Sequence, residues 1–376
     1  MLQNFSDLLS GLKYREVILL SIFATIWLLR LSFELFLFVT VILSKKKKIE
    51  KKPARPFSII FAIRNEEENL RENLPQLLNC GYPDFEVVVV DDFSQDNSLT
   101  TLGLLKKEYK NLRISSLNQE TRYSSKMARN IGIKAAQKDW ILTMEPSFEK
   151  PGDSWLESFS NSIGDESNLI IGYSNIVKQK GLFNLLFRIE LFLQQLNSFA
   201  YIKMGVGYVL KEDNIAFKKQ KYFDVGGFAG EMNEDYANME LLINKFLKKK
   251  STSFALTPET NIRNAQGIKG RDYKELLIKS WRIKRKLKLW KRLILIFDDF
   301  LRILFLPVAV TLFIVLPELT IAISLLVALK LIIHILIVAN TLIRLNEQKI
   351  FISSLIYEIF TPYIKMGLKW FNHRSP

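Results

Sequence analysis

Four consecutive valines, residues 87–90, followed at once by Asp91 and Asp92, constrain the fold of this chain more than any other stretch. A continuous β-branched run predicts a strand buried on both faces, which is the usual state of a strand inside a parallel sheet. Open α/β sheets bind ligands beyond the carboxyl ends of their strands. The two aspartates therefore either lie at a ligand site or only begin a turn and cap the following helix.

The sequence around this run alternates between short apolar stretches and helical patterns. We expect buried strands at residues 57–62, 87–90, 112–114 and 140–144, and helices at residues 99–109, 127–137, 182–199 and 240–246. A further helix is expected to begin near Asn65, a suitable N-cap that is followed by glutamates in the first turn. Strands that alternate with helices at this spacing predict a doubly wound α/β domain.

A long apolar segment precedes this domain. Residues 17–43 are almost wholly apolar and exceed the roughly 20 residues that span a bilayer. Their two charges, Arg30 and Glu34, are four residues apart and can pair on one helical face. Four lysines follow at residues 45–48, and a basic run after a span marks the cytoplasmic side. The segment therefore predicts a transmembrane anchor that leads into a cytoplasmic domain.

The last hundred residues are basic at first and then apolar. Residues 276–294 carry apolar side chains at helical spacing among many lysines and arginines, which predicts an amphipathic helix at a membrane interface. Residues 303–316 and 319–342 predict a hairpin of two spans with a very short turn. Residues 350–368 predict either a further span or a helix that lies in the interface.

These patterns divide the chain into three parts. We predict an N-terminal transmembrane anchor and basic linker over residues 1–50, the α/β domain over residues 51–275, and the interface helix with C-terminal transmembrane helices over residues 276–376. The net charge is +15, which suits either nucleic acid or the anionic face of a membrane. Because apolar segments flank the basic helix, we expect a membrane partner and no nucleic acid.

Cysteine and histidine are too few for a zinc site of the usual kind. The chain has one cysteine, Cys80, and two histidines, His334 and His373, which both lie far from the polar middle of the sequence. An internal disulfide and a zinc site built from these residue types are therefore excluded. Any metal bound here would be a hard cation held by carboxylates.

Three polar motifs follow one another in the α/β domain. They are Arg64-Asn65-Glu66-Glu67, then Asp91-Asp92 with Ser94 and Asp96, then Lys126 with Ala128-Arg129-Asn130 and Gly132-Ile133. Together they resemble the inverting family 2 glycosyltransferases with the GT-A fold, and their order and spacing fit over residues 55–160. Residues 214–217 and 223–228 also resemble the acceptor-side segment of that family. The sequence of one span, a cytoplasmic domain, an amphipathic helix and further spans is similar to its membrane-bound members.

The resemblance implies an α/β GT-A (Rossmann-like) cytoplasmic domain flanked by transmembrane helices, in a multi-pass protein of the cell inner membrane. It implies a glycosyltransferase that moves a sugar from a nucleotide-sugar donor to a lipid-linked or polysaccharide acceptor with inversion. Its nucleotide-binding residues would be Arg64, Glu66, Asp91, Asp92, Lys126 and Asn130. Asp92 would accept hydrogen bonds from the base or the ribose, and Arg64 or Lys126 would offset the diphosphate charge.

Two motifs of the family are altered in this chain. Where the family has an Asp-x-Asp pair for a divalent cation, this chain has Glu145, Pro146 and Ser147. Glu145 is then the one carboxylate left to hold a magnesium or manganese ion. Residues 279–285 keep the basic character of the Gln-x-x-Arg-Trp segment but not the motif, which argues against a processive synthase.

The catalytic base that the resemblance implies has two alternative positions. Asp235, with Glu234 beside it, matches the Glu-Asp motif of the family and would take the proton from the acceptor hydroxyl. Alignment on the helix at residues 241–245 instead places Asn238 and Met239 at the acidic positions. In that alignment Asp235 is a surface carboxylate that caps the helix.

These departures leave a second function open. The half of the site that holds the nucleotide is well represented, whereas the half that performs the transfer is reduced to Glu145 and Asp235. The alternative to an active transferase is a catalytically impaired, glycosyltransferase-like protein. It would act as a nucleotide-binding or scaffolding subunit in envelope polysaccharide synthesis.

Overall fold

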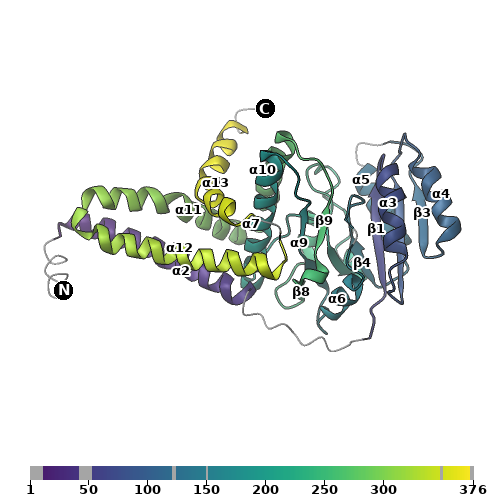
Figure 1. Ribbon diagram of the computed structural model, residues 1–376, viewed down its shortest axis with the longest axis horizontal. Helices are drawn as coiled ribbons and strands as arrows, with labels where there is room; N and C mark the ends of the chain where they lie inside the picture. Colours follow the sequence, from purple (N-terminus) through teal and green to yellow (C-terminus); the bar gives the residue numbers. More distant parts are fainter. Residues whose placement is uncertain (1–11, 42–52, 121–123, 150, 348–349, 373–376) are drawn as a thin grey trace. The chain divides into compact units, whose positions relative to one another are not determined.

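The chain folds into two compact units. The computed structural model describes residues 12–41, 53–120, 124–149, 151–347 and 350–372. One unit, the helical unit, comprises Met1–Lys45, Lys288–Leu342 and Phe351–Pro376. The other, the α/β unit, comprises Lys46–Leu287 and Ile343–Ile350. Figure 1 labels many of the helices and strands of both units.

The α/β unit is built on a seven-stranded sheet of order β3-β2-β1-β4-β7-β5-β8 (Figure 1). Its strands are β1 (Phe57–Ile63), β2 (Phe85–Asp91), β3 (Leu112–Ser116), β4 (Trp140–Thr143), β5 (Leu169–Gly172), β7 (Ile215–Lys218) and β8 (Thr252–Ala255). Strands β3, β2, β1 and β4 are parallel, and β7 is antiparallel to both β4 and β5. A separate parallel pair joins β6 (Ser174–Ile176) to β9 (Ile262–Asn264). The four expected strands are confirmed, and the sheet is mixed beyond β4.

Helices cover both faces of the parallel half of the sheet. The helices of this unit are α3 (Glu67–Leu78), α4 (Ser98–Glu108), α5 (Ser124–Ala135), α6 (Trp155–Asn161), α7 (Leu182–Met204), α8 (Lys219–Asp224), α9 (Glu240–Phe246), α10 (Gly270–Arg285) and the 3₁₀ turn η1 (Pro258–Thr260). Leu74 of α3 and Leu102 of α4 share a core with Val87 and Val89. On the opposite face, α5 approaches so closely that a Cβ at Gly132 would lie 2.7 Å from Ile60 Cγ2. The doubly wound arrangement predicted from the valine run is confirmed.

The first helix of this unit begins differently from the expectation. Glu66, rather than Asn65, is the N-cap of α3, so the prediction for Asn65 is wrong. Asn65 has a left-handed backbone with φ of 56°, which asparagine tolerates better than most residues. Its side-chain oxygen accepts a hydrogen bond from Gln95 N–H at 2.7 Å, and its own N–H donates to Ser94 Oγ at 2.9 Å. Asn65 therefore ties the end of β1 to the loop after β2.

In the described part of the chain, the helical unit is formed by four long helices. They are α2 (Tyr14–Val41), α11 (Leu289–Val315), α12 (Thr320–Arg344), whose last residues belong to the α/β unit, and α13 (Phe351–Asn372). The short turn η2 (Pro317–Leu319) joins α11 to α12, which confirms the predicted helical hairpin and its short turn, while the prediction that both helices are membrane spans remains a prediction. The single amphipathic helix predicted over residues 276–294 is wrong, because α10 ends at Arg285 and α11 begins at Leu289. No proline or glycine marks this break, and Lys286 there pairs with Glu234.

Two of the described helices are long and apolar enough to cross a membrane. They cover Tyr14–Leu37 and Pro317–Arg344, and they qualify by length and composition alone. The central helix of a soluble protein can have the same composition. The membrane setting, and the choice between a span and an interfacial helix for residues 350–368, therefore remain predictions.

Charged side chains inside the helical unit form a closed ring in which acidic and basic groups alternate. In order, the members of this ionic ring are Asp298, Arg30, Glu34, His334, Glu358 and Arg302, which contacts Asp298 again. The Arg30–Glu34 contact is 3.3 Å long, which confirms the predicted pair. The contact that closes the ring, Arg302 Nε to Asp298 Oδ2, is 2.8 Å long. All four helices of the unit contribute to the ring.

His334 is the member of the ionic ring whose charge depends on its protonation. Its Nδ1 lies 3.0 Å from Glu34, and its Nε2 faces Glu358. Because both neighbours are acceptors, the two ring nitrogens can both donate only as an imidazolium. Glu34, His334 and Glu358 are also close enough together to share a metal ion. Both carboxylates already face an arginine of the ring, however, so positive charge is present there without a metal.

Candidate active site

The two aspartates after the valine run lie at the carboxyl end of β2, beside the end of β1. Asp91 is 1% exposed and pairs with Ile63 in the β1–β2 register. One of its oxygens, Oδ2, accepts a hydrogen bond from Ser94 N–H at 3.1 Å, and the buried Oδ1 has no hydrogen-bond partner among the described residues. Asp92 is 5% exposed, and its N–H donates to Ile63 O at 2.7 Å. The local sequence thus places two buried carboxylates at the sheet edge that binds ligands in open α/β folds.

Arg64 and Glu66 lie at the same edge because they follow β1 directly. The Arg64 guanidinium is 40% exposed and pairs with Glu120 at 2.6 Å. The hydrogen bond to Glu120, together with the negative charges of Glu120 and Asp92, raises the pKa of Arg64. Burial raises the pKa of Glu66, whose Oε2 accepts a hydrogen bond from Asn69 at 2.6 Å. The structure therefore brings Arg64 and Glu66 together with Asp91 and Asp92.

Lys126 and Asn130, both on α5, have protein partners instead. Lys126 is 4% exposed, and its ammonium donates to Glu231 O at 2.5 Å and to Glu234 O at 2.6 Å. Burial lowers the pKa of Lys126. The Asn130 side-chain oxygen accepts a hydrogen bond from Tyr222 OH at 2.5 Å. Both side chains fasten later segments of the chain to α5, and their predicted contact with the nucleotide remains a prediction.

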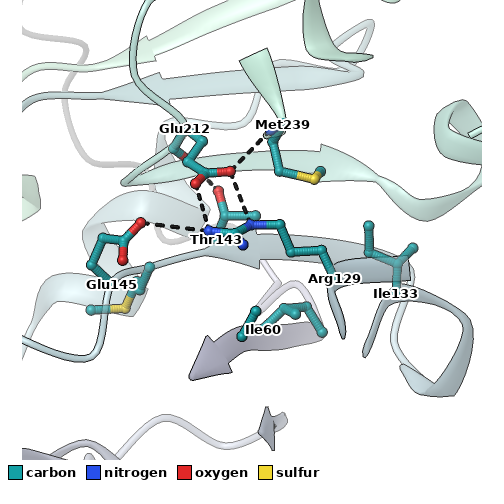
Figure 2. Close-up of a pocket in the computed structure, with 9 residues that line it drawn as sticks. Ile60, Arg129, Ile133, Thr143, Glu145, Glu212 and Met239 are labelled. Carbon is teal, nitrogen blue, oxygen red and sulfur yellow. Dashed lines mark hydrogen bonds and ion pairs between the residues drawn. The ribbon is translucent and has the colours of Figure 1, made fainter. Parts of the chain in front are cut away.

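A small pocket lies at the end of β4, and a charged triad lines it (Figure 2). The lining residues are Ile60, Ala62, Arg129, Ile133, Thr143, Met144, Glu145, Glu212 and Met239. Arg129 reaches Glu212 with both ends of its guanidinium, at 2.6 Å from Nη2 and 3.1 Å from Nε. The same Nη2 lies 3.7 Å from Glu145 Oε1. One guanidinium therefore lies between two carboxylates, held tightly by one and loosely by the other.

The two carboxylates of this triad have their pKa values pushed apart. Burial and the nearby charge of Glu212 raise the pKa of Glu145 to about 7, against the opposing effect of Arg129. Burial alone would raise the pKa of Glu212 as well, but Arg129, Lys279 and hydrogen bonds more than offset it and leave that pKa below its usual value. The Glu145 side chain is 36% exposed and that of Glu212 is 8% exposed. Pairs of acids shifted in opposite directions are typical of sites that move protons.

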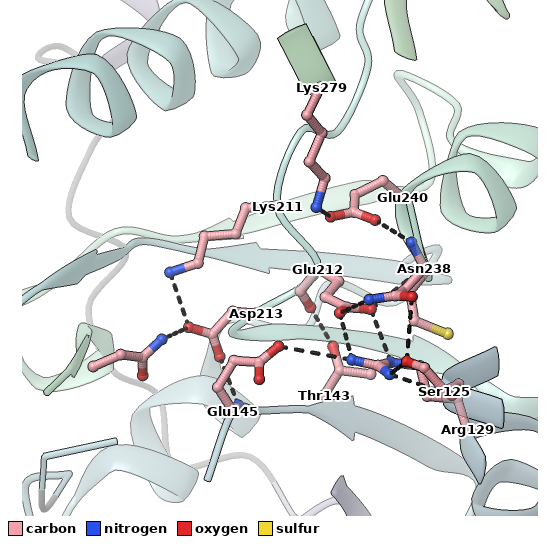
Figure 3. A network of polar contacts seen from close by, with 12 residues as sticks. Ser125, Arg129, Thr143, Glu145, Lys211, Glu212, Asp213, Asn238, Glu240 and Lys279 are labelled. Atoms are coloured by element: carbon pink, nitrogen blue, oxygen red, sulfur yellow. Dashed lines mark hydrogen bonds and ion pairs between the residues drawn. The ribbon is translucent and has the colours of Figure 1, made fainter. Parts of the chain in front are cut away.

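The contacts of Glu212 extend the triad to α9 and α10 (Figure 3). Asn238 Nδ2 and Met239 N–H donate to Glu212 at 3.1 and 3.0 Å. The N–H of Asn238 in turn donates to Glu240 at 2.9 Å, and Lys279 of α10 pairs with Glu240 at 2.5 Å. Among the described residues, the Glu212 carboxylate therefore accepts hydrogen bonds from Arg129, Asn238 and Met239. These donors compensate its negative charge.

Asp213, the next residue, supports Glu145 from the main chain. One oxygen of Asp213 accepts a hydrogen bond from Glu145 N–H at 3.2 Å, and the other accepts one from Asn264 at 2.7 Å and faces Lys211 at 3.1 Å. The sequence prediction for the site contained Glu145 but not Arg129, Glu212 or Asp213. Arg129 stands in the motif at residues 126–133, and the sequence signal of Glu212 and Asp213 is position, since they directly precede the segment at residues 214–217 that resembles the acceptor side.

The acids predicted as the base lie outside this pocket. Asp235 is an exposed turn residue, and Glu234 pairs with Lys286, which lowers the pKa of Glu234. Neither of them lines the pocket. Asn238, at the alternative acidic position, donates its amide to Glu212. Glu212, which lies in the loop before β7, is therefore adjacent to Asn238, the position at which the alignment on residues 241–245 expects an acid.

The comparisons with known proteins agree with this geometry. Residues 58–217 match the family described as Glycosyl transferase family 2. The chain is 28% identical over 132 residues to the amylovoran biosynthesis glycosyltransferase AmsB of Erwinia amylovora. The aligned region covers 34% of this chain and 44% of that protein. It is 27% identical over 133 residues to a poly(ribitol-phosphate) beta-glucosyltransferase of Bacillus spizizenii, which covers 35% and 21%. The match thus spans less than half of the length of these relatives.

One solved structure is similar over nearly the whole chain. It is the mannosyltransferase PcManGT from Pyrobaculum calidifontis, in complex with GDP-Man and Mn²⁺. The TM-score is 0.54 at 17% identity, and the match covers 92% of this chain and 98% of that one. At this level of identity the similarity establishes the fold, an α/β domain of the GT-A type with a mixed sheet.

Proposed function

Because residues 58–217 match the family described as Glycosyl transferase family 2, we propose that this protein moves a sugar from a nucleotide-sugar donor to a lipid-linked or glycan acceptor, with inversion at the anomeric carbon. The observation that carries this proposal is the acidic edge of the sheet. Asp91 ends β2 and Asp92 follows it, Glu145 lies after β4, and β1 lies between these two strands. The crevice beyond such strand ends is where open α/β sheets hold nucleotides.

The donor nucleotide is bound by the β2 side of this edge. The Asp92 carboxylate accepts hydrogen bonds from the base or the ribose hydroxyls. The neighbouring Asp91 Oδ1, which has no hydrogen-bond partner among the described residues, can accept a further one. The partly exposed Arg64 offsets charge on the diphosphate. Glu66 helps to hold the loop in which Arg64 lies, since its own N–H donates to Ser98 Oγ and the N–H of Asn65 donates to Ser94 Oγ, both after β2.

Glu145 is the proposed ligand of a divalent cation, magnesium or manganese. Its side chain is partly exposed, and carboxylate and hydroxyl oxygens, here Glu145 and Ser147, are the donors that hard cations prefer. Water and the diphosphate would supply the remaining ligands. When bound, such a cation stabilises negative charge on the leaving diphosphate. Mn²⁺ accompanies the nucleotide sugar in the structure of the similar mannosyltransferase.

Asp235 is the proposed base, and Glu145 is the alternative for that role. Asp235 fits by its match to the Glu-Asp motif, and Glu234 is adjacent to it. Glu145 fits by its pKa of about 7, which suits a group that accepts a proton near neutral pH. One carboxylate cannot at the same time hold a cation and accept the proton, so metal dependence separates the two assignments.

The setting we propose is the cell inner membrane, with several spans and the α/β unit on the cytoplasmic side. Two candidate membrane helices and the lysine run at residues 45–48 support this orientation. A membrane setting favours an acceptor that carries a lipid. It predicts that a cysteine-directed reagent confined to the outside of intact cells leaves Cys80 unmodified.

Nucleoside diphosphate binding tests the donor assignment. UDP, GDP and CDP are each added with and without Mn²⁺, and thermal unfolding of the full chain in detergent is followed. We expect one nucleotide to raise the unfolding temperature of the wild type and of Asp165→Asn, an exposed carboxylate, but not of Asp92→Asn. No response to any nucleotide in the wild type would contradict the proposal.

Turnover separates the transferase from its runner-up, a catalytically impaired nucleotide-binding or scaffolding subunit. The altered Asp-x-Asp and Gln-x-x-Arg-Trp motifs, together with the ambiguous position of the base, favour this second function. Release of nucleoside diphosphate from a donor sugar, abolished by Glu145→Ala or Asp235→Ala, would establish the enzyme. Nucleotide binding without turnover for any donor and acceptor would establish the subunit instead.

A further inference from the structure

The described residues directly after α12, residues 345–347, are called the joining segment and are part of the α/β unit. Within it, the Glu347 side chain is 0% exposed and pairs at 2.9 Å with Arg188 of α7, which is 1% exposed. The other oxygen of Glu347 accepts hydrogen bonds from Tyr173 OH at 2.7 Å and from Asn175 Nδ2 at 3.2 Å. A buried charge is tolerated only where it is paired and hydrogen-bonded, as it is here. Glu347 therefore fixes this joining segment in a defined place beside β6, the strand that carries Asn175.

The main chain of the joining segment is bonded to β9, the partner strand of β6. Asn261 donates its amide to the carbonyl of Leu345, and Arg263 donates to the carbonyl of Asn346. In the β6–β9 pair, Asn175 lies opposite Arg263. The joining segment is thus attached to both strands of the two-stranded sheet.

This two-stranded sheet also holds the loop that carries Glu145. Glu149 N–H donates to Arg263 O at 2.6 Å, and Ala265 N–H donates to Ser147 O at 2.7 Å. Phe148 forms an isolated bridge with Asn264. The loop after β4 is therefore an added strand-like edge on β9, and a shift of β9 moves it.

A second connection reaches Glu145 through the loop before β7. Asn264 of β9 donates to Asp213, and Asp213 accepts the hydrogen bond from Glu145 N–H. Asn214 donates its amide to Tyr173 O at 2.8 Å, and the hydroxyl of the same Tyr173 contacts Glu347. Both connections therefore run between the joining segment and the main chain of Glu145.

We propose that Glu347 is a positioning residue for Glu145 and acts through the two-stranded sheet. Glu347 lies 130 positions beyond the end of the region that matches the family, at residue 217. The transfer site of this chain is then completed by a segment between two apolar helices. The inference rests on the proposed function in one respect, since its kinetic test requires sugar transfer.

Amide hydrogen exchange of the full-length protein in detergent tests the connection without any activity. The variant is Glu347→Gln, and the control is Glu259→Gln, an exposed carboxylate beside the same sheet. We expect Glu347→Gln to speed exchange at least about fivefold in peptides that cover residues 143–149 and 210–214. Peptides that cover β1 and β2 should exchange at the wild-type rate. Unchanged exchange at residues 143–149, or faster exchange throughout the unit, would overturn the proposal.

Kinetics provide the second readout. Glu347→Gln should lower kcat by roughly 10- to 100-fold, because small misplacements of a reacting group have effects of that size. The affinity for the nucleoside diphosphate, measured without a divalent cation, should remain within about twofold of wild type, since Asp92 lies on the other side of β1. Equal losses in both quantities would indicate general damage and overturn the positioning role. If the wild type transfers no sugar, the proposed function fails while the exchange measurement still decides the connection.

Asn264→Ala provides a variant that leaves the Arg188–Glu347 pair intact, in case Glu347→Gln does not fold. It should speed exchange in the peptide that covers residues 143–149 while the peptide that covers residues 173–176 stays protected. Where both variants fold, the double variant should show no more than the larger single effect, because both changes interrupt one connection. Fully additive effects, or normal exchange at residues 143–149 in Asn264→Ala, would contradict the connection through β9.

Discussion

In the helical unit, each carboxylate of the ionic ring faces two basic groups of the ring, and the ring returns to the residue at which it begins. Asp298 faces Arg30 and Arg302, and Glu34 faces Arg30 and His334. In the α/β unit, the network around Arg129 ends at a carboxylate that is only loosely held. Glu145 lies 3.7 Å from Arg129, and its side chain is 36% exposed.

This difference separates a structural role from a chemical one. A closed ring leaves no charge uncompensated, so its members can do little except hold the four helices in register. At the end of the Arg129 network, the negative charge of Glu145 is only partly compensated by Arg129. A cation or a proton can supply the remaining positive charge. We therefore expect substitutions in the ring to lower the stability of the protein, and substitutions of Glu145 to lower its turnover.

The largest effect is expected on turnover in Glu145→Gln. We expect kcat to fall by about 10²- to 10⁴-fold, because the change removes either the cation ligand or the base. The unfolding temperature should stay near that of the wild type, since Glu145 makes one long ion pair. Release of nucleoside diphosphate, followed together with thermal unfolding, measures both quantities.

Glu149→Gln is the matched control for this prediction. Glu149 is exposed, lies in the same loop as Glu145, and bonds to β9 through its main chain rather than its carboxylate. It should keep the wild-type rate. If Glu145→Gln also kept that rate while Asp235→Asn abolished it, the base would be Asp235 and no protein ligand for the cation would be needed at Glu145.

The second effect is expected on stability in Glu34→Gln. The change leaves Arg30, Lys330 and His334 without the carboxylate that all three face. Breaking a buried pair from one side costs about 3–5 kcal/mol, which should appear in the free energy of unfolding measured in detergent. Glu318→Gln, at an exposed position of η2, is the control. A normal stability of Glu34→Gln would show that the ring does not hold the helices together.

The two networks also differ in how much of each could be predicted from the sequence. The valine strand and its two aspartates were predictable because burial and turn chemistry are local properties of residues 85–96. The Arg30–Glu34 pair was predictable for the same reason, since both lie on one helix four residues apart. The contact of Arg30 with Asp298 joins positions 268 apart and has no local signal. Pairing at that distance is decided by helix packing.

The transfer half of the site was harder to predict for the same physical reason. Arg129, Glu212 and Lys279 come from three separate elements, and each also fits a surface position in its own local sequence. Only packing around β4 shows that they surround Glu145. The break between α10 and α11 was missed because residues 286–288 contain no helix-breaking residue, and the pairing of Lys286 with Glu234 is again a tertiary contact.

A smaller effect is expected in the pH profile of Glu212→Gln. Glu145 acts as an anion in either proposed role, so activity should rise as pH increases through about 7 and be lost as pH falls below it. Removing the negative charge of Glu212 takes away one cause of the raised pKa of Glu145. The positive charge of Arg129, which lowers that pKa, then acts on Glu145 alone. The midpoint of the profile should therefore move to lower pH by roughly one unit. A midpoint that stayed near 7, or rose, would show that Glu212 does not set the charge of Glu145.

The smallest effect is expected in Lys330→Met. Lys330 contacts Glu34 but is not a member of the ring, so this variant tests whether the ring compensates its own charges without Lys330. Lys330 lies 3.7 Å from Glu34, but Glu34 already faces Arg30 and His334, and no link of the ring passes through Lys330. Its ammonium also lies 5.1 Å from the centre of the Phe305 ring, a contact that a methionine side chain partly replaces. Because the variant also removes the cost of burying an ammonium, the free energy of unfolding should change by less than about 1 kcal/mol. A loss as large as that of Glu34→Gln would mean that Glu34 depends on Lys330 and that the ring does not compensate its own charges.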